Sequence, residues 1–219
     1  MRAFDFYSPT YFVFGKERET ETGRYVKRFG GSRVLVVYGG QSAKRSGLLD
    51  RIMACLKEEN LYAVELGGVK PNPRSSLVYE GIELCRREKI DFVLAVGGGS
   101  VIDTAKAISL GAKNSVPLWE LYSGKAQTQR ALPIGVVLTT AATASEANGV
   151  SVLCHDVLHE KAALDEPLTR PRFALMNPVL TYTLPPRQTA SCAVDIFSHA
   201  FERYFHMQKG PRHSGAYGI

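Results

Sequence analysis

The chain has 219 residues, enough for one well-packed domain or for one domain and the beginning of a second. Hydrophobic residues make up 45% and charged residues 22% of it, which excludes a disordered or fibrous protein. The net charge of +6 is spread along the sequence with acidic residues between the basic ones, whereas a nucleic-acid-binding surface needs clustered basic residues. We therefore expect a folded protein without a nucleic-acid partner.

The cysteines and the amino-terminal sequence point to a reducing compartment. Cys55, Cys85, Cys154 and Cys192 have no paired spacing, which favours free thiols over a disulfide framework. Met1 is followed by charged and aromatic residues and not by an apolar leader, and no apolar run approaches the ~20 residues that a membrane span needs. The expectation is a soluble, cytoplasmic protein that does not bind membranes.

The predicted elements alternate between strands and helices. Two short strands are expected near the amino terminus, at residues 4–7 and 11–14. Three buried strands of β-branched and aliphatic residues follow, and each precedes a segment with helical periodicity. In chain order these are strand 33–38 with helix 42–59, strand 62–66 with helix 74–88, and strand 92–96 with helix 100–111. Such long crossovers join parallel strands, so the sequence predicts an open, mostly parallel α/β sheet with helices on both faces.

The second half of the chain is expected to complete this sheet and to begin another domain. A strand at 134–138 runs into a polar segment, and strand-like runs at 149–154 and 172–176 close the sheet region. Pro185 and Pro186 then open a helix from about Arg187. We expect residues 1–184 to form a dinucleotide-binding domain, residues 185–219 to start a helical metal-binding domain, and the tail from Lys209 to be unstructured.

A turn of three glycines is the strongest functional signal in the chain. Gly97, Gly98 and Gly99 follow a buried strand, and without a Cβ they allow unusual dihedrals and a close approach of the backbone to a phosphate. Ser100 is expected to begin the next helix, whose free N–H groups and positive dipole end favour an anion. Ser100 and Asp103 also have the spacing of a capping box, which is an alternative role for both. The pattern predicts a pyrophosphate site at the carboxyl ends of the strands.

A second signal is a carboxylate and an imidazole one helical turn apart. Asp195 and His199 are at i and i+4, so they project from one helix face about 6 Å apart, as two ligands of one divalent cation would. A surface ion pair is the alternative interpretation. His206 is expected ~10 Å further along the axis, beyond reach of the same ion, and His213 follows a helix break.

Three motifs together resemble one enzyme family. The string Gly-Gly-Gly-Ser-Val-Ile-Asp-Thr-Ala-Lys at 97–106 comes after Pro-Asn-Pro at 71–73 and before Thr-Thr-Ala-Ala-Thr-Ala-Ser-Glu at 139–146. This order resembles the iron-containing (group III) alcohol dehydrogenases, and most of all their NADPH-dependent butanol dehydrogenase-like branch. The resemblance runs from about residue 6 to about residue 205. It implies an α/β nucleotide domain followed by an all-helical domain, with the metal and active site in the cleft between them.

The resemblance also implies roles for individual residues. Asp195 and His199 are the first two ligands of Fe²⁺ or Zn²⁺, and the family takes two more histidines from helices that this sequence does not contain. The expectation is therefore a truncated chain with impaired activity. Many relatives have glycine where Ala144 stands, so its methyl group is expected to crowd the backbone near the nicotinamide. The implied cofactor-binding residues are Gly97, Gly98, Gly99 and Ser100 at the pyrophosphate, Asp103 beside the cofactor, Thr139, Thr140 and Thr143 lining the cleft, and Asn148 and Lys161 near the ribose and phosphates.

The residues after the first predicted buried strand indicate which nicotinamide cofactor is preferred. A carboxylate there would bind the ribose 2′-hydroxyl and repel a 2′-phosphate. The sequence has none: Gly39 and Gly40 open the backbone, Ser42 offers a hydroxyl, and Lys44 and Arg45 add positive charge. We therefore predict NADP(H) over NAD(H), with the 2′-phosphate against Gly39, Gly40 and Ser42.

The implied reaction is reversible hydride transfer between NADP(H) and small aliphatic alcohols or aldehydes, with the metal polarising the substrate oxygen. Two alternatives remain at this point. Glycerol dehydrogenase-like and dehydroquinate synthase-like enzymes use a similar glycine turn, and the chain is alternatively a noncatalytic NADP-binding remnant. Dimeric relatives suggest a homodimer in which residues 4–14 form an intersubunit strand.

Overall fold

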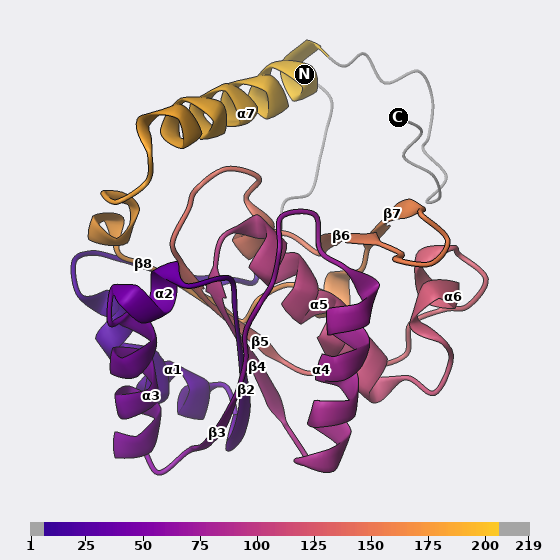
Figure 1. Cartoon of the computed structure of the whole chain (residues 1–219), viewed down its shortest axis with the longest axis horizontal. Coiled ribbons are helices and arrows are strands. Elements are labelled where there is room, and N and C mark those ends of the chain that lie inside the picture. Colours follow the sequence, from indigo (N-terminus) through magenta and orange to yellow (C-terminus); the bar gives the residue numbers. More distant parts are fainter. Residues whose placement is uncertain (1–6, 206–219) are drawn as a thin grey trace.

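The computed structural model describes residues 7–205, which form a parallel sheet with helices on both faces (Figure 1). The sheet has six strands in the order β1-β8-β5-β4-β2-β3, and every neighbouring pair is parallel. This confirms the predicted fold class. The strand expected at 4–7 falls almost wholly outside the described residues, as do His206, His213 and the tail from Lys209.

The strands are β1 (Tyr11–Phe14), β2 (Arg33–Tyr38), β3 (Tyr62–Leu66), β4 (Phe92–Gly97), β5 (Ile134–Leu138), β6 (Val150–Cys154), β7 (Lys161–Asp165) and β8 (Phe173–Met176). The α-helices are α1 (Thr22–Arg28), α2 (Ser42–Arg45), α3 (Leu48–Glu58), α4 (Ser75–Arg87), α5 (Gly99–Lys113), α6 (Leu118–Tyr122) and α7 (Pro186–Phe205). Short 3₁₀ helices are η1 (Arg18–Glu21), η2 (Ser145–Ala147), η3 (Pro167–Thr169) and η4 (Pro178–Thr181).

Each face of the sheet has its own apolar core. Val34 and Val36 of β2 pack in the cluster that includes α1 and α3, whereas Leu35 and Val37 pack in the cluster that includes α4 and α5. Figure 1 shows these two helix pairs on opposite sides of the sheet. Both faces of β2 are therefore covered, which explains its continuous apolar sequence.

The helix expected at 42–59 is two helices. Gly47 adopts a left-handed φ of 67° between α2 and α3, and its N–H donates to Lys44 O at 2.9 Å. Glycine takes this conformation at little cost, so it ends the first helix and lets the chain restart in a new direction. The prediction of a single helix is wrong because the left-handed conformation of Gly47 interrupts the helical segment.

The run at 149–154 does not join the main sheet. It forms β6, which pairs antiparallel with β7 in a separate two-stranded sheet, with Val150 opposite Asp165 and Cys154 opposite Lys161. The run at 172–176 does enter the main sheet, as β8 between β1 and β5. Helices α1 and α6 and strand β7 were not expected from the sequence.

The described part of the chain contains no helix long and apolar enough to cross a membrane. Its four cysteines are free. Cys85 is buried, and burial raises the pKa of its thiol to about 12. Because the thiolate is the reactive form, this side chain is expected to be inert.

Candidate cofactor site

Three predicted binding segments meet at one edge of the sheet. Tyr38 of β2 is opposite Val96 of β4, and Gly97 is opposite Leu138 of β5, so the segments that follow these strands leave the sheet side by side. Thr139 N–H donates to Gly97 O at 3.1 Å and joins two of them directly. In open parallel sheets this carboxyl edge is where ligands bind.

The amino end of α5 carries unpaired backbone donors. Val101 and Ile102 donate their N–H groups to Gly98 O at 3.0 and 3.1 Å. The N–H groups of Gly99 and Ser100 have no partner among the described residues, and no side chain caps the helix. Because α5 has 15 residues, its positive dipole end and these free donors fit an anionic pyrophosphate.

The three glycines are needed for space and not for unusual dihedrals, because none of them has a positive φ. A Cβ on Gly97 would lie 2.5 Å from Val101 Cγ2, and one on Gly98 would lie 3.2 Å from Thr140 Cβ. A Cβ on Gly99 would lie 3.0 Å from Thr143 Oγ1. Thr140 and Thr143 of the threonine segment therefore pack directly against the glycine turn, and the two segments together form one wall of the candidate site.

The capping box expected at Ser100 and Asp103 is not formed. The helix begins at Gly99, and the Asp103 carboxylate accepts hydrogen bonds from Ser145 Oγ at 2.7 Å and Val152 N at 3.2 Å. Burial raises the pKa of Asp103, and the Ser145 hydroxyl opposes this shift. The side chain is turned away from the helix end because η2 and β6 offer it partners in the interior.

Two other predicted residues contact the protein itself. Lys161 Nζ donates to Asn72 Oδ1 at 3.2 Å, which joins β7 to the Pro-Asn-Pro loop. Asn148 donates through Nδ2 to Ala144 O at 2.9 Å, and its Oδ1 accepts from Val150 N at 2.9 Å. In this structure the amide of Asn148 therefore shapes its own loop.

The residues after β2 leave room for a phosphate. Gly40 and Ser42 are exposed, and a Cβ on Gly40 would meet no atom within 4 Å. Lys44 Nζ lies 5.3 Å from the centre of the Tyr38 ring, and a hydrogen bond with Tyr38 raises the pKa of this lysine. Arg45 is exposed. The segment is thus polar, open and positively charged.

The predicted metal ligands lie on α7. Figure 1 shows this helix on the side where the parallel strands end. His199 Nε2 is 3.6 Å from Asp195 Oδ1, which confirms that both side chains project from one face of the helix. Residues 7–205 contain no group of three or more His, Cys, Asp or Glu side chains able to hold a metal. These two donors are one fewer than catalytic zinc sites use, so the described residues do not complete a metal site.

Sequence reasoning missed Lys106. Its side chain is fully buried, and burial lowers its pKa to about 8. The sequence held one signal: apart from Asp103, the other residues from Val101 to Gly111 are apolar, small or hydroxyl-bearing, so this part of the helix has no charged face on which a lysine would be exposed. The structure buries all of these residues except Asp103. An interior lysine needs several oxygen partners, which indicates a polar network behind the site.

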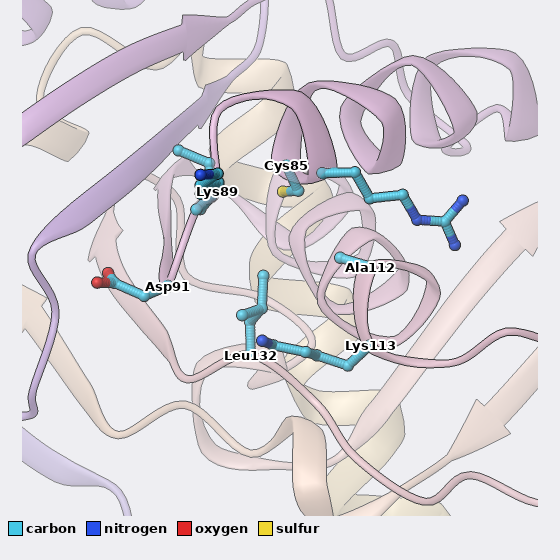
Figure 2. A pocket seen from close by; sticks show the side chains of 8 residues that line it. Cys85, Lys89, Asp91, Ala112, Lys113 and Leu132 are labelled. Carbon is cyan, nitrogen blue, oxygen red and sulfur yellow. The ribbon is translucent and has the colours of Figure 1, made fainter.

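The cavity shown in Figure 2 does not belong to this site. It has a volume of about 290 Å³ and lies near the amino ends of β4 and β5, opposite the glycine turn. Arg86 donates to Gly111 O and Asn114 O at 3.0 and 3.3 Å there. The basic side chains that line this cavity, Arg86, Lys89 and Lys113, therefore interact favourably with the negative carboxyl ends of helices α4 and α5.

Ala144 is strained, and replacing it with glycine is expected to stabilise the protein. Its φ of 54° and ψ of 33° are left-handed, a conformation that costs a non-glycine residue about 1 kcal/mol. Ala144→Gly should therefore raise the free energy of unfolding by about 0.5–1 kcal/mol, measured by urea denaturation. Ala142→Gly, at a position without a positive φ, should lower it. Equal effects of the two substitutions would contradict the argument.

The fold and this edge define a nucleotide-binding α/β domain. Residues 9–178 match the iron-containing alcohol dehydrogenase family. The chain is 48% identical over 206 residues to "Probable NADH-dependent butanol dehydrogenase 2" of Bacillus subtilis, covering 94% of this chain and 53% of that protein. It is 39% identical over 207 residues to NADPH-dependent aldehyde reductase YqhD of Escherichia coli, covering 93% of this chain and 52% of that protein.

A solved structure of NADH-dependent butanol dehydrogenase A from Thermotoga maritima is also similar. It superposes with a TM-score of 0.91 at 41% identity, over 94% of this chain and 52% of that one. The protein belongs to the iron-containing alcohol dehydrogenase family, as the motifs indicated. The chain spans about half the length of the curated relatives it matches.

Proposed function

We propose that this chain binds NADP(H) at the glycine turn and serves hydride transfer between the cofactor and small aliphatic alcohols or aldehydes. The observation that carries the proposal is the uncapped amino end of α5, where Gly99 and Ser100 present free N–H groups beside a wall of threonines. The bound nicotinamide would supply the hydride acceptor or donor. The chain's own residues would hold the pyrophosphate at Gly97 to Ser100 and orient the cofactor along Thr139, Thr140 and Thr143.

The preference for NADP(H) rests on the residues after β2. Relatives of this chain include proteins named as NADH-dependent and one named as NADPH-dependent, so relatedness alone does not choose between the cofactors. Gly39, Gly40 and Ser42 present no carboxylate to repel a 2′-phosphate. The exposed Ser42 hydroxyl is free to donate a hydrogen bond to it.

Removing that hydroxyl is expected to weaken NADPH selectively. Ser42→Ala should raise the Kd for NADPH about tenfold, because a hydrogen bond to a charged group contributes about 1.5 kcal/mol or more, and should leave the Kd for NADH unchanged. Both constants are measured by fluorescence titration of the purified 219-residue chain. Wild-type protein that binds NADH as tightly as NADPH would overturn the cofactor assignment.

We propose Asp195 and His199 as two ligands of Fe²⁺ or Zn²⁺, a role that their donor chemistry supports. A metal at a completed site would polarise the substrate oxygen. We further propose that the boundary between the two domains lies near residue 185. The free cysteines favour a cytoplasmic location for the protein. The exposed edge strand β1 favours a homodimer.

The alternative functions are distinguished by repeating the NADPH titration and then adding butyraldehyde with Fe²⁺ or Zn²⁺ under anaerobic conditions, with NADPH oxidation as the measured quantity. Metal-dependent NADPH oxidation would support the alcohol dehydrogenase assignment. NADPH binding without turnover would support the hypothesis of a noncatalytic NADP-binding remnant. Activity on polyols or sugar phosphates would support a glycerol dehydrogenase-like or dehydroquinate synthase-like enzyme. The named relatives are butanol dehydrogenases and an aldehyde reductase, which favours the first outcome.

A further inference from the structure

Lys106 is a charged side chain at the centre of the buried face of α5. It has no exposed surface, and its Nζ lies within hydrogen-bonding distance of four oxygen atoms. These are Ser145 O at 2.8 Å, Ser145 Oγ at 2.9 Å, Asn148 Oδ1 at 3.2 Å and Val150 O at 2.7 Å. Three N–H donors thus hold a short stretch of chain at three positions, and all three ammonium protons have partners.

All four oxygens belong to the segment that continues the cofactor wall. This segment, residues 144–150, follows directly on Thr143, which lies against Gly99. Asp103, one turn before Lys106, binds the same segment through Ser145 Oγ and its continuation through Val152 N. The Asp103 carboxylate and the Lys106 ammonium, both on α5, therefore hold the same loop by hydrogen bonds.

The carboxyl end of the segment is also held by its neighbours, because Gly149 O accepts from Glu166 N at 3.1 Å and from Thr169 Oγ1 at 2.9 Å, and Val150 pairs with Asp165 of β7. Nearer the glycine turn, the segment is bound to α5 through Ser145 and Asn148. It contains the left-handed Ala144, only a three-residue 3₁₀ helix, and the internal contacts of Asn148. In contrast, α5 is a 15-residue helix with buried residues on almost every side. The glycine turn lies at the amino end of that same helix, so a loop fixed to Lys106 is fixed relative to the pyrophosphate site.

We propose that Lys106 is a positioning residue for the cofactor cleft, which sets the distance between the threonine wall and the glycine turn by holding segment 144–150 against helix α5. It does not itself touch the cofactor. The inference rests on the proposed cofactor binding. It adds that the affinity for NADPH depends on Lys106, a residue buried behind the cleft.

The test compares Lys106→Met with Lys113→Met, an exposed lysine on the same helix. Methionine has a similar length but no N–H, so buried oxygens lose their donor. Lys106→Met is expected to raise the Kd for NADPH about tenfold and to speed amide hydrogen exchange in 144–150 while exchange in β4 stays unchanged. Lys113→Met should alter neither.

A second pair of variants covers the case in which Lys106→Met does not fold. Ser145 and Ser151 are both buried, but Ser145 contacts Lys106 whereas the Ser151 hydroxyl is bonded to Tyr122 at 2.6 Å. Ser145→Ala should weaken NADPH binding about threefold and loosen 144–150. Ser151→Ala should lower stability alone.

A pH titration separates positioning from bulk stability. Burial places the pKa of Lys106 near 8, while Asp103 of α5, Glu146 of η2 and Asp165 of β7 raise it and Arg170 lowers it. A neutral amine has two N–H groups for four oxygens, so the Kd for NADPH should rise between pH 7 and 9.5. Between pH 8 and 10.5 the unfolded chain binds more protons at this site than the folded chain, so this lysine makes the free energy of unfolding rise with pH in that range, which overlaps the rise in Kd between pH 8 and 9.5. A purely structural role would not move affinity and stability in opposite directions.

The outcomes are distinct. A folded Lys106→Met that binds NADPH like wild type, with unchanged exchange in 144–150, would overturn the inference. If the wild type itself binds no NADPH, the proposed function fails, and hydrogen exchange still decides whether Lys106 holds the segment. Faster exchange throughout the chain in every variant would show a general structural role and would also overturn it.

Discussion

Replacing Phe173 with alanine is expected to lower the free energy of unfolding by about 3–5 kcal/mol. The ring is fully buried on β8 and lies 5.6 Å from the Tyr25 ring, 5.8 Å from Phe29 and 6.0 Å from Phe92, measured between ring centres. It also lies over Gly135 of β5, where only glycine leaves space for it. Alanine would leave a cavity among rigid strands that cannot close around it.

Phe14→Ala is the matched control, because the same side chain is 72% exposed on the neighbouring strand β1. It should cost under about 1 kcal/mol, since surface substitutions have small effects. Both values come from urea denaturation followed by circular dichroism. Similar losses for the two variants would show that Phe173 is not the centre of this core.

The second large effect is expected at Gly98. Its φ of −97° and ψ of −166° are open to alanine, so Gly98→Ala should fold. The added methyl would stand 3.2 Å from Thr140 Cβ, at the mouth of the helix amino end. It would keep a phosphate away from the N–H groups of Gly99 and Ser100. We expect the Kd for NADPH to rise about 10- to 100-fold, as lost charge-assisted hydrogen bonds predict.

Gly124→Ala separates lost binding from lost stability. Gly124 has a φ of 73° after α6, away from the predicted contacts, and a Cβ there would meet no atom within 4 Å. Alanine should cost about 1 kcal/mol of stability through backbone strain and leave the Kd for NADPH unchanged. If Gly98→Ala binds NADPH as wild type does, the pyrophosphate does not lie at this turn.

The outcome of the helix predictions shows where local signals fail. The periodicity of 42–59 correctly predicts helical structure, but a glycine inside a periodic segment gives no local sign of whether the helix will continue through it or end there. Packing of α3 against α1 on one sheet face requires the change of direction at Gly47. Similarly, β6 has the alternation of a half-buried strand, and nothing in residues 149–154 says that its partner is β7 and not β8.

The sequence by itself determined the parallel α/β class, the position of the glycine turn and the pairing of Asp195 with His199 on one helix face, because each depends on residues close in the chain. Tertiary structure decided the strand order, the separate β6–β7 hairpin, the turn of Asp103 away from the helix end, and the burial of Lys106. Apart from the hairpin, whose strands are close in the chain, these features depend on residues far apart in the sequence, such as Lys106 and Ser145 in the buried network or Tyr11 and Phe173 in the sheet. Only folding brings such groups to hydrogen-bonding distance, and there the requirement that every buried polar group find a partner selects their contacts.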